Sequence, residues 1–313
     1  MVKLFNFVKN FLIKKKMKIL AIISRTLVGL VFLFSGYVKA VDPLGSSYKF
    51  NDYFTAFGMD FLTSLSFPMA IILASIEFLV GLFLIVGIIT EISSLMALIF
   101  MVIFTPLTLY LAFENPVTDC GCFGDAIILT NWETFYKNIV ISAFAVILFL
   151  LRKKAQISIK KYFEYIIAVF LVFLVLSFEL YNYRHLPVHD FRPYKINNFL
   201  PDLMEVPEGV QGNEYANIYK MENTKTKEKK EINSKEYIDT EIWKDTTWVI
   251  TETSDESILI IKGYEPPIHD FELSNELGDD MTHEILESDI VFLLVAYDLD
   301  ETNRKAMKIS WCR

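Results

Sequence analysis

Cysteine is scarce, and basic residues are few in one part of the chain. Three of the 313 residues are cysteine, too few for a disulfide framework although enough for one bridge. Residues 201–313 hold 12 Lys or Arg against 26 Asp or Glu, a net charge of −14, whereas residues 1–200 hold 18 against 12, a net charge of +6. So acidic a segment repels nucleic acid and anionic lipid, and we therefore expect no nucleic-acid partner.

Apolar residues, by contrast, are abundant. They make up 53% of the chain, and the mean hydropathy of +0.37 is above that of soluble domains. Five stretches approach the roughly 20 residues that a hydrocarbon core of about 30 Å requires of a helix. The predicted spans are residues 19–41, 67–89, 92–113, 132–151 and 162–181.

Two of these stretches need separate comment. The first is too long for the core of a signal peptide and has no small-residue cleavage site, which favours an uncleaved anchor. The fourth is the weakest, because it contains Glu133 and Lys137 and depends on Trp132 and Tyr136 as an interfacial anchor.

The basic residues of the loops predict the orientation, because Lys and Arg collect on the cytoplasmic side. Two clusters flank the predicted spans: Lys14, Lys15, Lys16 and Lys18 before the first, and Arg152, Lys153, Lys154, Lys160 and Lys161 between the fourth and fifth. With five spans, the loops 42–66 and 114–131 and the acidic tail then lie outside. The sequence therefore predicts an all-α polytopic membrane bundle, a four-helix core plus a fifth span, followed by a small, mostly β extracytoplasmic region.

This pattern predicts a domain order along the chain. The parts are a basic cytoplasmic N-terminus (1–18), a four-helix membrane domain (19–151), a cytoplasmic loop with the fifth helix (152–181), a linker (182–212) and an acidic β-rich region (213–313). Aromatic residues spaced by three and four predict an interfacial helix within loop 42–66. In the tail, Thr247–Thr251 and Ser257–Tyr264 flank a polar turn and predict a β-hairpin.

The most specific motif is Asp119-Cys-Gly-Cys-Phe-Gly-Asp125, which contains Cys120 and Cys122. Disulfides persist on the extracytoplasmic side, and the glycines give the backbone the freedom that so tight a ring requires. A disulfide across one intervening residue is strained, which favours exchange over a structural role, although a structural or idle pair stays open. The acidic neighbours Asp119 and Asp125 disfavour thiolate formation, so we do not expect an activated nucleophile.

A metal site is a weaker alternative for the same cysteines. His185 and His189 are also predicted on the outer side and would complete a Cys₂His₂ set with donors suited to zinc. Pro187 lies between the two histidines and prevents the regular helix that would bring both rings to one face. We therefore predict no metal site.

Ionisable residues inside the spans are a second candidate site, because each is costly in hydrocarbon. They are Arg25, Lys39 and Glu77. At about 1.5 Å per residue, Glu77 lies roughly 18 Å and Arg25 about 9 Å from the inner ends of their spans, and Lys39 lies about 30 Å away. These depths predict an ion pair between Arg25 and Glu77, either as a structural pair or as a polar site for a quinone headgroup or a proton.

The first 150 residues contain a set of polar, glycine and cysteine positions: Arg25, Gly29, Phe32–Lys39 (FLFSGYVK), Glu77, Gly81, Gly87 and the CGCFGD run. On these positions, this part of the chain resembles the DoxX and MauE families of bacterial membrane proteins. MauE-type proteins resemble helpers of periplasmic disulfide formation, linked to methylamine dehydrogenase maturation, and DoxX relatives are associated with quinone-linked sulfur oxidation.

The resemblance implies roles for the candidate residues and a location for the chain. Cys120 and Cys122 would be the catalytic redox pair. Arg25, Lys39 and Glu77 match polar positions of the family pattern and are the candidate cofactor-binding residues, with a quinone as the candidate cofactor. The resemblance implies a bacterial inner membrane. The orientation predicted from the basic loop residues then places the N-terminus in the cytoplasm and the C-terminal region in the periplasm.

A second resemblance covers about fifty residues of the tail. Pro266–Leu273, Gly278 and the apolar run Val291–Ala296 are similar to the opening of thioredoxin-like domains. The expected cysteine loop is replaced by Tyr297–Glu301, and the sequence given stops at Trp311-Cys312-Arg313. We therefore expect a truncated or degenerate version of that domain.

Together, these features predict a membrane thiol-disulfide redox protein that supports disulfide formation in, or maturation of, extracytoplasmic proteins. Its partner would be an extracytoplasmic protein substrate or a thioredoxin-like protein, and the reaction could be linked to a quinone. The alternative is a non-enzymatic membrane assembly protein whose acidic tail docks a partner and whose cysteines only fix the loop.

Overall fold

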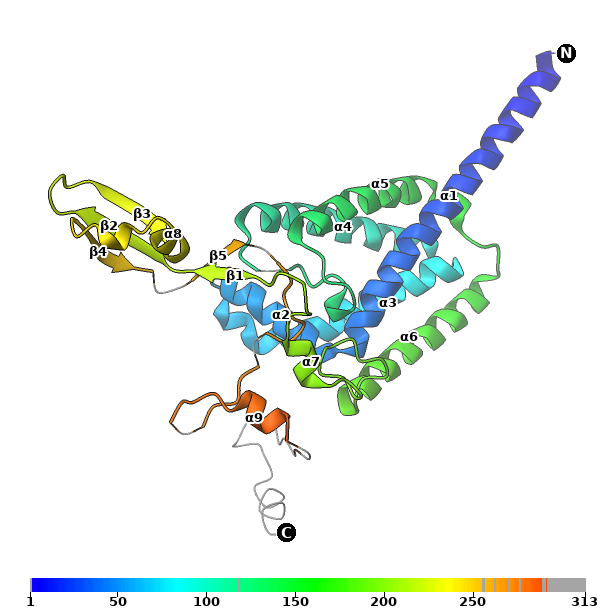
Figure 1. Ribbon diagram of the computed structural model, residues 1–313. Coiled ribbons are helices and arrows are strands. Elements are labelled where there is room, and N and C mark those ends of the chain that lie inside the picture. Colours follow the sequence, from blue (N-terminus) through cyan, green and yellow to red (C-terminus); the bar gives the residue numbers. More distant parts are fainter. Residues whose placement is uncertain are drawn as a thin grey trace, which may run out of the picture. The chain divides into compact units, whose positions relative to one another are not determined.

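The computed structural model describes residues 2–117, 119–254, 257–261, 263–269, 271–275, 277–288 and 291. The chain divides into two compact units, Met1–Arg192 and Pro193–Arg313. The first is helical and the second contains small antiparallel sheets (Figure 1). Apart from Val291, the predicted strand Val291–Ala296 lies outside the described residues, as do Tyr297–Glu301 and Cys312.

The first unit is a membrane bundle. Its elements are α1 (Val2–Val41), α2 (Pro43–Ala56), η1 (Asp60–Leu65), α3 (Ser66–Val86), α4 (Thr90–Glu114), η2 (Gly124–Ala126), α5 (Asn131–Ala155) and α6 (Lys161–Arg184). Within the described residues, five helical segments are long and apolar enough to cross a membrane: Lys14–Val41, Asp60–Val86, Thr90–Glu114, Asn131–Ala155 and Lys161–Arg184. The predicted all-α bundle with five spans is confirmed.

α1 is the central helix of the bundle. It packs chiefly against α3 and α5, while α4 packs on α5 and α6 lies against α1 and α3. Small and branched side chains fill the core between these helices, including Ala21, Val28, Leu84 and Leu148. The outer faces are apolar as well: Phe173 of α6, for example, is 71% exposed, which suits a helix whose surroundings are hydrocarbon.

Two glycines allow α1 and α3 to approach closely. A Cβ atom on Gly36 would lie less than 3.0 Å from the backbone of Phe78, and one on Gly81 would lie equally close to the backbone of Leu33. Only glycine fits at such contacts between helices. The crossing fixes the register of the pair, so that Ser35 and Lys39 come level with Glu77.

The start of α5 explains how the weakest predicted span forms. Thr130 is its N-cap: the Thr130 Oγ1 accepts from the Glu133 backbone N at 3.3 Å, and Glu133 Oε2 accepts from the Thr130 backbone N at 2.9 Å. This reciprocal capping box satisfies backbone donors at the beginning of the helix. Glu133 therefore helps to begin α5 and does not interrupt it.

The second unit has two small sheets. Its elements are α7 (Leu200–Met204), β1 (Glu214–Ala216), β2 (Ile218–Asn223), β3 (Lys229–Asn233), α8 (Ser234–Asp239), η3 (Ile242–Lys244), β4 (Trp248–Thr253), β5 (Ile258–Ile261) and α9 (Thr282–Leu286). One sheet has the antiparallel order β3-β2-β4, and the other pairs β1 with β5.

The predicted hairpin between Thr247–Thr251 and Ser257–Tyr264 is therefore wrong. β4 pairs with β2, whose Met221 is fully buried, and β5 pairs with β1. The β2/β4 pairing also places Lys220 opposite Glu252, with 2.9 Å between Nζ and Oε2. Pairing with β2, which is distant in the sequence, thus covers the Met221 side chain and forms the Lys220–Glu252 ion pair, whereas a local hairpin would do neither.

Candidate functional site

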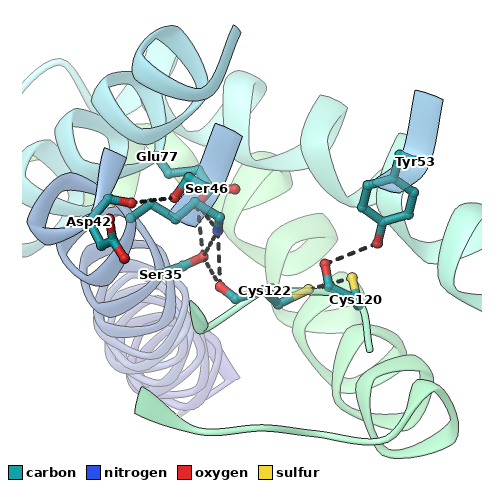
Figure 2. Close-up of polar contacts among 8 residues, drawn as sticks. Ser35, Asp42, Ser46, Tyr53, Glu77, Cys120 and Cys122 are labelled. Atoms are coloured by element: carbon teal, nitrogen blue, oxygen red, sulfur yellow. Dashed lines mark hydrogen bonds and ion pairs between the residues drawn. The ribbon is translucent and has the colours of Figure 1, made fainter. Parts of the chain in front are cut away.

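The cysteine motif lies in the loop between α4 and α5 and brings its two thiols together. The Sγ atoms of Cys120 and Cys122 are 2.8 Å apart, and both cysteines are free thiols (Figure 2). Gly121 and Gly124 have φ angles of +66° and +48°, in the left-handed region that favours glycine. The glycines therefore let the chain turn so that both sulfurs lie on the same side.

The loop is held by its main chain (Figure 2). The carbonyl oxygen of Cys122 accepts from Ser35 Oγ at 2.7 Å and from Lys39 Nζ at 2.9 Å. The carbonyl oxygen of Cys120 accepts from the hydroxyl of Tyr53 at 3.0 Å. α1 and α2 thus fix the position of both cysteines through backbone atoms.

Lys39 links this loop to a buried ion pair. Its Nζ lies 2.8 Å from Glu77 Oε2 and also donates to Ser35 Oγ at 2.7 Å. Only 9% of Lys39 and 6% of Glu77 are exposed. With the bond to Cys122, every hydrogen of the ammonium group has an acceptor, as a buried charge requires.

The predicted ion pair between Arg25 and Glu77 is wrong. Arg25 Nη1 donates to the carbonyl oxygen of Ala155 at 2.7 Å, where α5 ends. Arg25 also lies beside Gly87, which follows the last residue of α3. α1 continues as a helix well before residue 19, so Arg25 is level with the end of α3 and not with Glu77. The structure therefore brings Lys39 and Glu77 to the thiols and leaves Arg25 at the opposite end of the bundle.

One acidic neighbour of the cysteines, Asp119, is paired with a lysine. Asp119 Oδ2 lies 2.7 Å from Lys49 Nζ of α2, and Asp119 Oδ1 accepts from the backbone N of Gly121 at 2.7 Å. On the other side, Lys137 of α5 places its Nζ 4.1 Å from the centroid of the Phe123 ring. Lysines of α2 and α5 therefore lie on two sides of the loop.

The two thiols differ in acidity. The hydrogen bond from Cys120 lowers the pKa of Cys122 to about 6; burial opposes this, and the charges of Lys137 and Lys39 support it. The same hydrogen bond, together with burial, raises the pKa of Cys120. At neutral pH, Cys122 is thus the thiolate and Cys120 the thiol that donates to it. The expectation of an unactivated pair is corrected by these contacts.

Both thiols line a cavity of about 560 Å³. α1, α3 and α4 supply most of its apolar wall, and Lys39, Glu77, Tyr53 and Lys137 supply polar groups near the cysteines. The cavity therefore combines an apolar body with a few converging polar groups, as ligand pockets commonly do.

The histidines of the zinc alternative have other partners. His189 lines the cavity and its Nδ1 forms a hydrogen bond with the hydroxyl of Tyr37. The ring of His185 stacks on that of Tyr181 with 4.4 Å between centroids. Over the part of the chain that the structure describes, no three or more His, Cys, Asp or Glu side chains are grouped so as to hold a metal ion.

Sequence reasoning missed four residues of the site: Ser35, Lys49, Tyr53 and Lys137. Ser35 precedes Lys39 by one helical turn and so shares its face, which the helical period could have shown. In the sequence, Lys137 counts only as a charge that weakens the fourth predicted span, although a charge at such a position is itself a sign of function. Lys49 and Tyr53 reach the loop through the tertiary position of α2, for which the sequence offers no comparable sign.

The lowered pKa predicts how thiol reactivity depends on pH. Alkylation of Cys122 by iodoacetamide is expected to rise through pH 6 and level off above it, because only the thiolate reacts. In Lys137→Met the midpoint should move to higher pH, whereas Lys137→Arg, which keeps the charge, should resemble the wild type. Mass spectrometry of the alkylated peptide at each pH gives the rate. A wild-type midpoint near pH 9 would contradict the assignment.

The fold and the site define a polytopic membrane protein with a thiol pair in a loop at one end of a helical bundle. Residues 17–151 match the family model described as "Methylamine utilisation protein MauE". This range includes both cysteines, Lys39 and Glu77, so the membrane domain is MauE-like. Searches of the curated proteins and of the solved structures found no match. The resemblances to DoxX proteins and to thioredoxin-like domains stay predictions from the sequence.

Proposed function

We propose that this protein is a membrane thiol-disulfide redox protein that supports disulfide formation in, or maturation of, extracytoplasmic proteins. The observation that supports it is the pair of free thiols 2.8 Å apart, of which one has a lowered pKa and the other a raised pKa. A nucleophilic thiolate beside a protonated resolving thiol is the arrangement that exchange chemistry requires.

The exchange proceeds through a mixed disulfide. The Cys122 thiolate attacks one sulfur of a partner disulfide, which forms the Cys122–partner bond and releases a partner thiolate. Cys120 then passes its proton to that thiolate, which becomes a thiol, and attacks Cys122 Sγ; this forms the Cys120–Cys122 disulfide and releases the second partner sulfur as a thiolate. Two electrons move to the partner. Run in reverse, the same path oxidises a partner dithiol and reduces the Cys120–Cys122 disulfide.

The proposed orientation places the thiols outside the cytoplasm. The basic residues Lys14–Lys18 and Arg152–Lys154 lie at the end of the bundle opposite the cysteine loop, and such residues favour the cytoplasmic side. A protein substrate would then reach the thiols from the extracytoplasmic compartment, where protein disulfides persist.

The test is maleimide gel-shift labelling in intact cells of a Cys312→Ser chain, with and without prior reduction. We expect Cys120 and Cys122 to be labelled by a membrane-impermeant maleimide only after reduction, and to become protected again when the reductant is washed out. Single Cys120→Ser and Cys122→Ser chains serve as labelling controls. Thiols that stay reduced and inert, or that are labelled only from the cytoplasm, would favour the assembly protein whose acidic tail docks a partner.

A further inference from the structure

α2 presents a row of aromatic rings to the cavity that contains the thiols. Phe50, Tyr53 and Phe54 of α2 and Phe57, its C-cap residue, recur at helical spacing, and all four line the cavity. Phe54 is buried and the other three are half-buried. The aromatic spacing that predicts a helix in loop 42–66 therefore also builds one wall of the cavity. We call these four residues the α2 aromatic face.

α4 supplies a second apolar wall. Phe100, Phe104 and Leu107 share one face of this helix and line the cavity, and the rings of Phe100 and Phe104 stack with 5.7 Å between centroids. Of the polar side chains in the wall, Lys39 and Glu77 are already paired with each other. A ligand in this cavity therefore gains free energy mainly by burying apolar surface.

The thiols form part of the same wall. Cys120 is buried and Cys122 only partly exposed, and both line the cavity. Exchange requires the Cys122 sulfur to touch a sulfur of the partner. The residues beside the partner's cysteine must therefore enter the cavity and meet its apolar walls. A volume of about 560 Å³ has room for a disulfide and about two large apolar side chains.

The cavity also reaches a polar surface beside α2. Ser46 and Lys49 of α2 line it there together with Asp125, and all three are at least partly exposed. α2 follows the spanning segment Lys14–Val41 and precedes the segment Asp60–Val86, so it lies outside both. A peptide can therefore reach the thiols from water without crossing the hydrocarbon.

We propose that the cavity binds an extended segment of a partner protein in which large apolar residues flank the disulfide. This inference rests on the proposed function, because it names the class of substrate whose disulfide Cys122 attacks. Large apolar residues are mostly buried in a folded protein and become accessible in a chain that has not finished folding. The substrate is therefore an incompletely folded protein and not the surface of a folded one.

Binding is measured first, on the full chain without thiols, Cys120→Ser/Cys122→Ser/Cys312→Ser, in lipid nanodiscs. The probes are two fluorescent peptides of equal length and charge with one S-methylated cysteine, flanked by Leu and Phe in the apolar peptide and by Ser and Gly in the polar peptide. Fluorescence anisotropy gives each Kd, and empty nanodiscs give the binding to lipid alone. We expect the apolar peptide to bind at least about tenfold tighter than the polar one.

Variants of the cavity wall test where the peptide binds. Phe50→Ser/Phe57→Ser removes two rings of the α2 aromatic face, and we expect it to weaken binding of the apolar peptide about tenfold, with the polar peptide unchanged. The matched control is Leu44→Ser: Leu44 is also in α2 and is 47% exposed but does not line the cavity, so binding should stay at the parent value. If the double variant does not fold, Leu107→Trp, which fills the cavity, should weaken binding of the apolar peptide instead.

Exchange is measured second, on the Cys312→Ser chain with disulfide-linked forms of the same two peptides. At low peptide concentration we expect the apolar peptide to react at least about tenfold faster, because kcat/KM includes its tighter binding. Equal binding of the two peptides, or equal weakening in Leu44→Ser, would overturn the inference; the proposed function then stands if both peptides are still exchanged. Tight binding of the apolar peptide without any exchange would remove the proposed function and, with it, the role of this ligand as a substrate.

Discussion

Cys122→Ser is expected to abolish thiol-disulfide exchange, with a loss of at least about 10³-fold in rate, because it removes the thiolate that attacks the partner. Cys120→Ser should behave differently. It keeps the attacking sulfur but lacks the thiol that resolves the intermediate, so a mixed disulfide through Cys122 should accumulate. Non-reducing gels and mass spectrometry of a model disulfide peptide after reaction distinguish the two variants.

The two variants control for each other, because the loop is held by main-chain carbonyls that both retain. A mixed disulfide that accumulates in Cys122→Ser instead would mean that Cys120 is the attacking residue. Unchanged exchange in either variant would remove the exchange mechanism altogether.

Removing one member of the buried ion pair is the second large effect that we expect. Lys39→Met leaves the Glu77 carboxylate buried without its countercharge, which should cost about 3–5 kcal/mol of stability, or lower the melting temperature by roughly 10 °C. Thermal unfolding of the purified chain in detergent, followed by size-exclusion chromatography, measures the loss.

The double variant Lys39→Met/Glu77→Met distinguishes two roles of Lys39: its contribution to stability as part of the ion pair, and its hydrogen bond that holds the cysteine loop. With neither charge left, most of the lost stability should return, because replacing a whole buried pair by apolar side chains is often neutral. The Cys122 carbonyl oxygen nevertheless keeps only Ser35 as a donor, so exchange should be slower than in the wild type. A double variant as unstable as Lys39→Met would show that the pair contributes little through its charges.

The bundle was predictable because the spans depend on local properties of the sequence. Length and hydropathy place both ends of α3 to α6 to within four residues. Even α5, weakened in prediction by Glu133, forms because that residue caps it. The sheets were not predictable in the same way. β4 and β5 take partners far along the chain, and the sequence between them resembles an ordinary turn.

The sequence identified which residues gather at the site, but it did not identify which of them contact one another. Cys120, Cys122, Lys39 and Glu77 all line one cavity, as polar residues in costly positions often do. The partner of Glu77 was mistaken because depth was counted from the predicted span ends, whereas the close crossing at Gly36 sets the true level of the helices. An error of a few residues in the predicted start of a span is enough to assign Glu77 to Arg25 when its true partner is Lys39.

Because the cysteine loop is held through its backbone, the side chains at positions 120 and 122 can be replaced without loss of these contacts. Lys39, Ser35 and Tyr53 bind carbonyl oxygens, which every amino acid possesses, so the bundle specifies where residues 120 and 122 lie without specifying what they are. Selenocysteine at position 122 would occupy the same place as the natural thiolate and provide a selenium nucleus for spectroscopy. The chain thus offers a membrane scaffold in which different reactive groups can be compared at one fixed position.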